Sequence, residues 1–343
     1  MILKKWKSKL DGNNFLLVVT VVLFLFLYGA GMIIFGDKGF AKPQVFLNLF
    51  ISNAGLIVAS VGMTMVLITA GIDISIGSVI GMTCMLLAWL MENRGMNAMV
   101  SILIVLIVGT LFGMVQGILV AYFKIQPFIV TLAGMFFARG MTAMISSQMI
   151  SISNADFLAI ANAKIYLSFI STVNKKGKII HPYIYPSVII ALIVLVIAFL
   201  LLKYTKFGRS IYAVGGNEQS ALLMGLNVKK VKLKVYMMNG FLAALAGFVF
   251  CLNSCGGFVE QARGFEMEAI ASAVIGGTLL TGGVGNVIGS LFGVLIKGSI
   301  ESLITFQGTL SSWWTKIAIA ILLCFFIILQ SVFASIKRKK EGK

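Results

Sequence analysis

Asp73 is an acidic residue inside an apolar tract, and its spacing from two glycines is typical of a turn with a special role. The tract runs from about residue 49 to residue 91, and Gly71 and Gly77 flank the aspartate. An ionised carboxylate in hydrocarbon is costly unless it caps a helix or serves a function. With Ser75 assisting, Asp73 can cap the helix that follows, which accounts for the residue type and for both glycines. The alternative is a gate or a contact with a second protein.

Other charged residues are rare in the apolar segments. Only Asp73 and Arg139 are candidates for helix interiors, so a proton-coupling carboxylate is disfavoured. Arg139 either extends outward to the membrane interface or faces a polar pathway. Lys297 and Glu301 are spaced i and i+4, and we expect them to pair near the outer end of a helix.

A second segment with chemical content is polar and basic, and it runs from Phe207 to Lys234. Asn217 suits a helix N-cap, Glu218 suits the first turn, and Gly225 suits the position after the helix. The apolar residues between them predict a two-turn helix with an exposed apolar side. Such a helix must bury that side against a soluble partner or beneath the rest of the chain.

The elements that position these residues are membrane-spanning helices. Of 343 residues, 59% are hydrophobic and 11% are charged, whereas soluble domains carry about 25% charged residues. The sequence therefore predicts a single all-α integral membrane domain over residues 1–343. The first apolar segment follows four lysines and precedes no small-residue cleavage site, which favours an uncleaved helix over a signal peptide.

About ten spans of roughly 20 residues can be placed. We expect them at 15–35, 50–70, 74–91, 98–122, 128–150, 187–203, 235–251, 265–281, 284–300 and 313–333. This path places both termini and the basic loop at about 204–234 in the cytoplasm, in agreement with the positive-inside rule. The opposite face is nearly neutral, so the net charge of +17 does not indicate a nucleic-acid partner. The eighth span has a short apolar core, and its alternative is a re-entrant segment.

Glycines at intervals of four residues predict how two spans pack. One stripe lies on the fourth span and the other on the ninth, and both favour close helix contacts in lipid over a ligand role. Their members are Gly109, Gly113 and Gly117, and Gly285, Gly289 and Gly293. The largest outer loop, about 151–186, contains a candidate surface helix that either covers the bundle or receives an external partner.

Several kinds of chemistry are excluded or disfavoured. The phosphate-binding pattern G-x-x-x-x-G-K-[ST] is absent, so the chain has no nucleotide site of that type. The sole histidine, His181, lies in the outer loop, and the four cysteines are scattered along apolar segments. We therefore expect no catalytic constellation, no metal site and no cofactor in this chain.

Several segments, in order along essentially the whole chain, resemble one family. Glu218, Gln219, Ser220 and Gly225 are similar to the E-A-A, spacer, G pattern in permease subunits of bacterial ATP-binding cassette importers, with Gln and Ser in place of two alanines. "GIDISIGSV" and "FEMEAIASAVIGGTLLTGGVGNVIGSLFG" resemble the branch that carries ribose, galactose and xylose. "GTLSSWWTKIAIAILL" is similar to a permease of the galactofuranose importer.

The resemblance implies a multi-pass subunit of the prokaryotic inner membrane that translocates a monosaccharide. It implies three partners: an ATPase that binds ATP and Mg²⁺ and docks at Asn217 to Gly225, a second and different permease, and an external sugar-binding protein. The alternatives are a permease of this architecture for a nucleoside or a branched-chain amino acid, and an ion-coupled secondary transporter. In a sugar pathway, Asn53, Gln116, Asn239 and Arg139 are candidate lining residues, although each amide suits a helix–helix hydrogen bond equally well.

Overall fold

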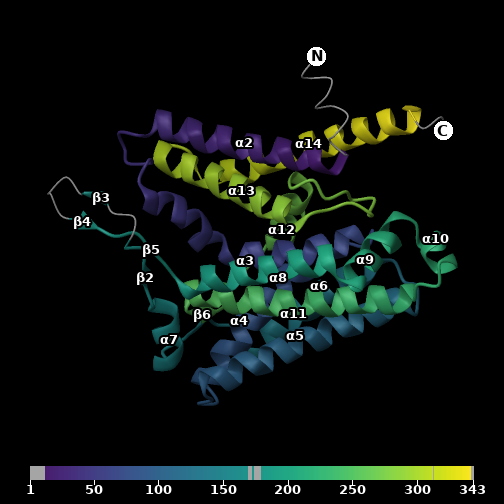
Figure 1. Ribbon diagram of the computed structural model, residues 1–343. Helices are drawn as coiled ribbons and strands as arrows, with labels where there is room; N and C mark the ends of the chain where they lie inside the picture. The colour runs from purple at the N-terminus through teal and green to yellow at the C-terminus, as the bar shows by residue number, and fades with distance from the viewer. Residues whose placement is uncertain (1–11, 169–171, 174–178, 312, 341–343) are drawn as a thin grey trace.

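The computed structural model describes residues 12–168, 172–173, 179–311 and 313–340. The lysines at positions 4 to 9, which the topology prediction uses, lie outside the described residues. Long helices run side by side through most of the molecule (Figure 1). The helices are α2 (Gly12–Ile34), α3 (Pro43–Ile68), α4 (Ile76–Glu92), α5 (Ala98–Ala121), α6 (Pro127–Ile145), α7 (Ala155–Asn162), α8 (Pro186–Tyr204), α9 (Lys206–Gly216), α10 (Glu218–Leu223), α11 (Val228–Ser254), α12 (Phe265–Ile275), α13 (Val287–Gln307) and α14 (Trp313–Lys340).

Proline and asparagine mark many of the helix starts. Pro43, Pro127 and Pro186 are the first residues of α3, α6 and α8, where a missing backbone N–H costs nothing. Asn97 and Asn286 accept backbone hydrogen bonds at the starts of α5 and α13. Local sequence therefore fixes where these helices begin.

A helix lies at each of the ten expected places, which confirms an all-α membrane protein. In the part of the chain that the structure describes, eight helices are long and apolar enough to cross a membrane, whereas α4 has 17 residues and α12 has 11. The eighth span begins at Phe265 as expected, but its predicted end at residue 281 is wrong, because α12 ends at Ile275. Gly277, Gly282 and Gly283 follow with positive φ, a backbone state that favours glycine and ends the helix. At 1.5 Å per residue, α12 is only about 16 Å long.

The expected glycine contacts are present between α5 and α11. A Cβ on Gly113 would lie 2.9 Å from the Gly240 Cα atom, and one on Gly117 would lie 3.0 Å from the Leu233 carbonyl oxygen. On the other stripe, Gly289 and Gly293 face α12, where a Cβ on Gly293 would lie 2.9 Å from the Ser272 Cα atom. Gly285 precedes α13 instead of lying on it.

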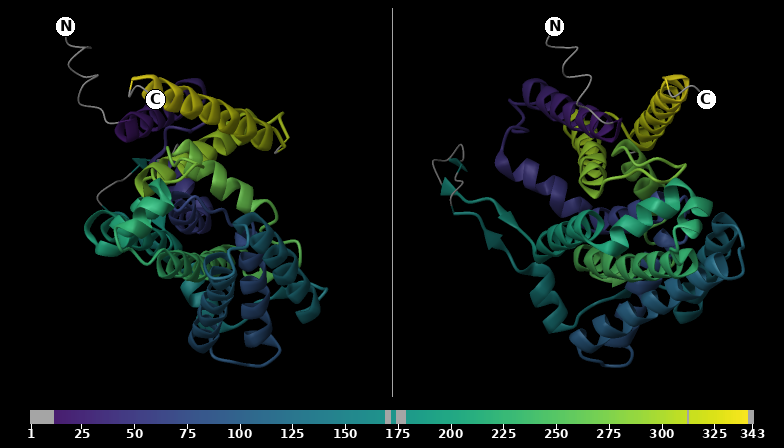
Figure 2. Two further views of the ribbon diagram at one scale, coloured as in Figure 1. Left: turned by 90° about the vertical axis from the view of Figure 1, so that its right-hand side faces the viewer. Right: turned by 45° about the vertical axis from the view of Figure 1, so that its right-hand side comes forward.

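The two ends of the bundle differ. In Figure 1 the start of α2, helices α9 and α10 and the end of α14 lie at one end, which we call the α10 end. Helix α7 and most of the short strands lie at the opposite end, the α7 end, and the right-hand view of Figure 2 shows the same separation. The strands pair as β1 (Ile150–Ser151) with β6 (Gly256–Gly257), β2 (Ile165–Tyr166) with β5 (Tyr183–Ile184), and β3 (Thr172–Val173) with β4 (Ile179–Ile180).

Candidate functional site

The turn between α3 and α4 holds Asp73 in a buried hydrogen-bond network. Only 2% of Asp73 is exposed. Its Oδ1 atom accepts bonds from the Ser75 backbone N–H at 2.8 Å and from the Ser75 hydroxyl at 2.6 Å. Its Oδ2 atom accepts a bond from the Asn239 amide of α11 at 2.6 Å. Asp73 therefore closes the turn before α4 and joins it to α11, whereas Ser75 occupies the N-cap position without a side-chain cap bond. Asp73 was expected to cap the N-terminus of α4, but its carboxylate stabilises the turn before the helix instead.

The same turn is tied to α5. The Gln116 amide donates to the Ser75 hydroxyl at 2.9 Å, and the Tyr236 hydroxyl donates to the Ile72 carbonyl at 3.3 Å. Gly71 leaves room for this tyrosine, since a Cβ there would lie 2.6 Å from the hydroxyl oxygen. Gln116 of α5 and Asn239 of α11 thus bond the turn before α4 inside the bundle, a role close to the helix–helix hydrogen bond that was one of the two open for them. Tyr236 was not singled out from sequence, because nothing local marks its distant partner.

Arg139 lies beside the segment that leads into α12. Its guanidinium donates to the backbone carbonyls of Val259 at 2.6 Å and Gln261 at 2.8 Å. Those carbonyls belong to irregular backbone, which has no helical partners of its own. Arg139 therefore holds this segment in place from α6, a role different from either extension outward or simple lining of a pathway.

Gly77, at the start of α4, faces the first turn of α12. A Cβ there would collide with the Glu266 carboxylate and would lie 2.8 Å from the Ala262 carbonyl oxygen. Among the described residues, no hydrogen-bond partner lies near the buried Glu266 Oε2 atom. Gly77 is thus required for close approach. No local pattern marks Glu266, because its contact with α4 spans almost 200 positions of the chain.

Lys297 is the centre of an ionic cluster inside the bundle. Only 8% of it is exposed, and its ammonium lies 2.7 Å from Glu301 and 3.4 Å from Glu268. It also donates to the Asn53 side-chain oxygen at 3.1 Å. The predicted pairing with Glu301 is present. The expected position at the outer end of the helix is wrong, because Lys297 lies midway along α13, opposite α12 and α3.

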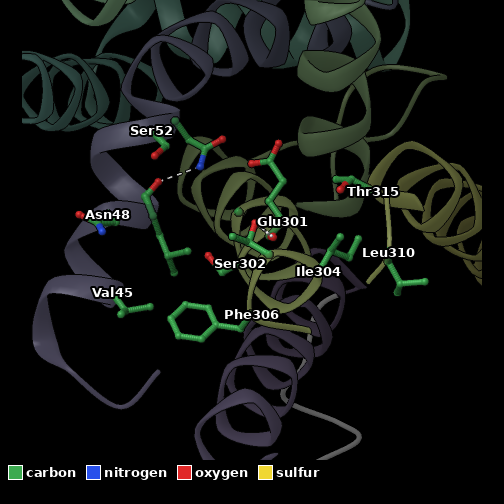
Figure 3. Close-up of a pocket in the computed structure, with 13 residues that line it drawn as sticks. Val45, Asn48, Ser52, Glu301, Ser302, Ile304, Phe306, Leu310 and Thr315 are labelled. Atoms are coloured by element: carbon green, nitrogen blue, oxygen red, sulfur yellow. Dashed lines mark hydrogen bonds between the residues drawn. The ribbon is translucent and has the colours of Figure 1, made fainter. Parts of the chain in front are cut away.

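A cavity of about 510 Å³ adjoins this cluster between α3, α13 and the start of α14. Figure 3 shows the α3 side chains on one wall and those of α13 on the other, with Glu301 among them. Its polar lining residues are Asn48, Ser52, Asn53, Glu301, Ser302, Thr305 and Thr315. These groups offer both hydrogen-bond donors and acceptors, so the cavity suits a neutral polar solute better than an apolar one. Of the four candidate lining residues, Asn53 is the one that lines it.

Helix α10 presents an apolar surface at the α10 end. The Asn217 side chain accepts from the Ser220 N–H at 2.8 Å, and Glu218 pairs with Lys232 of α11 at 2.6 Å. Gly225 follows with φ +78. Ala221 is buried, but the side that includes Leu223 points outward. The exposed residues are Leu222 at 64%, Leu223 at 88% and Met224 at 68%. Three consecutive exposed apolar side chains at the end of one short helix, the last of them at its C-cap, are typical of a protein contact.

Comparison with known proteins finds a permease family and several transporter permeases that are similar to this chain. A family model described as "Branched-chain amino acid transport system / permease component" matches residues 45–327. The chain is 41% identical over 318 residues to the inner membrane ABC transporter permease protein YjfF of Escherichia coli, with 93% of this chain and 92% of that protein covered. It is 36% identical to the fructose import permease protein FruG of Bifidobacterium longum, with 97% and 95% covered. It is 35% identical to the ribose import permease protein RbsC of Haemophilus influenzae, with 88% and 89% covered. No solved structure matches.

Proposed function

The chain belongs to the family of branched-chain amino acid transport system permease components, and we propose that it is the membrane subunit of an ATP-driven importer that translocates a monosaccharide. It is a multi-pass inner-membrane permease. The observation that carries the proposal is the exposed apolar surface of α10, which sits on a chain without a P-loop pattern of its own. Such a surface is suited to receive a motor subunit that binds ATP and Mg²⁺.

Such an importer needs separate subunits for ATP hydrolysis, for cargo delivery and for the second half of the pore. An ATPase docks at Asn217 to Gly225 at the α10 end, which is then the cytoplasmic end. A sugar-binding protein delivers the cargo at the α7 end. A second permease, different in sequence, completes the membrane pore. The matched family supports an ATPase and a binding protein in general terms.

A monosaccharide is supported as cargo by two relatives, whose names specify fructose and ribose. The polar cavity beside Glu301 fits this class, because a sugar presents hydroxyl groups that both donate and accept hydrogen bonds. The segment "GTLSSWWTKIAIAILL" points more narrowly to a galactofuranose-like sugar. The family description itself favours a second candidate, a branched-chain amino acid.

The test is to isolate the tagged chain from its native cells and to identify the co-purifying subunits by mass spectrometry. We expect an ATPase and a second permease. The purified complex is then reconstituted with its binding protein, and ATP hydrolysis is measured with each candidate cargo. Stimulation by a monosaccharide and not by leucine supports the sugar. Uptake by vesicles that contain the two permeases but no ATPase would contradict the proposal.

A further inference from the structure

The segment between α11 and α12 descends into the bundle without helical structure. Glu92, the last residue of α4, marks the α7 end, since it accepts hydrogen bonds from the Ser153 and Asn154 backbone N–H groups at 2.7 and 3.0 Å. Helix α4 therefore serves as a ruler, because each residue adds 1.5 Å along its axis. Positions along the segment can be read from the α4 residues that it touches.

Three contacts give the depth of the segment. A Cβ on Gly257 would lie 2.5 Å from the Met85 Cα atom, one on Gly81 would lie 2.9 Å from the Gln261 carbonyl oxygen, and one on Gly77 would lie 2.8 Å from the Ala262 carbonyl oxygen. Along α4, Met85, Gly81 and Gly77 lie about 10, 16 and 22 Å from Glu92. The hydrocarbon core of a bilayer is about 30 Å thick. With Glu92 placed at the membrane surface, Gln261 and Ala262 lie about 16–22 Å below it, well inside the core, and Arg263 follows directly.

Side-chain hydrogen bonds hold the segment between α11 and α12 in place. Gln261 is 1% exposed, and its side chain donates to the Ser254 hydroxyl at 2.8 Å and to the Gly256 carbonyl at 3.2 Å. Arg139 holds the segment from the other side through two carbonyls. The Gln261 amide and the Arg139 guanidinium thus both have hydrogen-bond partners within the protein.

The outward-pointing side chains differ sharply. Glu260 and Arg263 pair with each other at 2.7 Å, and their side chains are 59% and 78% exposed. Met267, one turn into α12, is 56% exposed. Irregular backbone and exposed charges do not face lipid at this depth, and they are tolerated where they line a water-filled cavity or are covered by protein.

A helix face suited to lipid looks different at the same depth. Helix α5 exposes Leu103, Ile107, Leu111 and Val115 along one side, all of them apolar. Leu111 lies about 20 Å from the start of α5 at the α7 end, a depth close to that of Arg263. The contrast separates a face for lipid from a face for water within one chain.

We infer that the face formed by Glu260, Arg263 and Met267 lines the water-filled path through which a neutral polyhydroxylated solute passes. The carboxylate and guanidinium supply an acceptor and several donors, which is what hydroxyl groups require. The nature of the solute rests on the proposed function, whereas the presence of water at this face does not. The second permease then covers this path from the far side and leaves space between the two chains.

Thiol accessibility tests this inference in the assembled transporter. Arg263→Cys, Met267→Cys and the control Leu111→Cys are made in a chain whose Cys255 and Cys324 are serine, since Cys84 and Cys251 are buried. Membranes that contain the complete complex are treated with a charged methanethiosulfonate reagent. Only a hydrated thiol ionises and reacts, so we expect Arg263→Cys and Met267→Cys to react at least about tenfold faster than Leu111→Cys.

The labelling results distinguish failure of the path from failure of the proposed cargo. Equal, slow reaction of Met267→Cys and Leu111→Cys overturns the inference, because lipid or the second permease then covers the face. Met267→Cys carries the test if Arg263→Cys fails to assemble, which is judged by basal ATP hydrolysis before labelling. Labelling uses no sugar. Fast labelling without sugar-stimulated ATP hydrolysis therefore refutes the proposed cargo alone, and slow labelling with normal stimulation refutes the path alone.

Discussion

Replacing Lys297 with methionine should destabilise the transporter through charge rather than volume. Methionine keeps most of the aliphatic stem and removes the ammonium. At 2.7 and 3.4 Å from Glu301 and Glu268, and with an effective dielectric constant of about 20, the two attractions are roughly 6 and 5 kcal/mol. The desolvation of the ammonium offsets much of this sum. Breaking a buried pair costs about 3–5 kcal/mol.

The net loss is smaller than that range because one partner is half-exposed. The Glu301 side chain is 41% exposed and the Glu268 side chain 24%, so solvent screens part of the interaction. We expect Lys297→Met to lower the free energy of unfolding by about 2–4 kcal/mol. The apparent melting temperature of the detergent-solubilised complex should then fall by roughly 3–6 °C. Size-exclusion chromatography after heating measures it.

Two further variants separate charge from packing. Lys316→Met removes an exposed lysine that lies 4.5 Å above the Trp313 ring, and it should leave the melting temperature unchanged. Combining Lys297→Met with Glu268→Gln and Glu301→Gln removes all three charges, and it should recover much of the loss. The charge argument is wrong if Lys297→Met has the melting temperature of the wild type. It is also wrong if the triple variant has a lower melting temperature than Lys297→Met alone.

Three other predictions concern the remaining sites. Glu218→Lys should abolish sugar-stimulated ATP hydrolysis while the chain still elutes as a folded species, because it replaces the Lys232 ion pair with repulsion at the docking helix. Asp73→Asn should retain more transport than Asp73→Ala, because an amide oxygen can still accept the two Ser75 bonds. Gly77→Ala should reduce the yield of folded chain, because its methyl group collides with the Glu266 carboxylate and lies 2.8 Å from the Ala262 carbonyl oxygen, and Glu266→Ala should restore part of the yield in the double variant by removing the first collision.

Each of these predictions has an opposing result. Normal stimulation of ATP hydrolysis in Glu218→Lys would count against docking at α10. Equal inactivity of Asp73→Asn and Asp73→Ala, measured by uptake into proteoliposomes, would show that the charge matters more than the turn. No rescue of Gly77→Ala by Glu266→Ala would place the collision elsewhere.

The helices were largely predictable because local signals determine them. Apolar runs of sufficient length identify spans, and prolines at positions 43, 127 and 186 begin three of them. The length of α12 was not predictable in this way. Hydropathy continues to Leu280, but the positive φ of Gly277 stops the helix. Apolar character alone does not specify which backbone conformation a glycine adopts.

The side-chain clusters were less predictable because they depend on contacts far apart in sequence. Lys297 and Glu301 are four residues apart, so helical periodicity revealed their pairing. Glu268 and Asn53 reach the same ammonium from α12 and α3. No pattern along a single helix indicates that convergence, since it depends on how α12 packs between α3 and α13.

Several polar residues inside this bundle are explained by its two breaks. Asp73 and Asn239 satisfy the turn before α4, and Arg139 satisfies the carbonyls before α12. Because lipid cannot pair with exposed backbone groups, each interruption of a helix needs such partners. Amide and guanidinium groups that look like pathway lining in the sequence are therefore engaged by the protein itself. Beside the breaks, the groups free to meet a solute are those that project outward, so we propose Arg263, rather than Gln116 or Asn239, as a residue of the path.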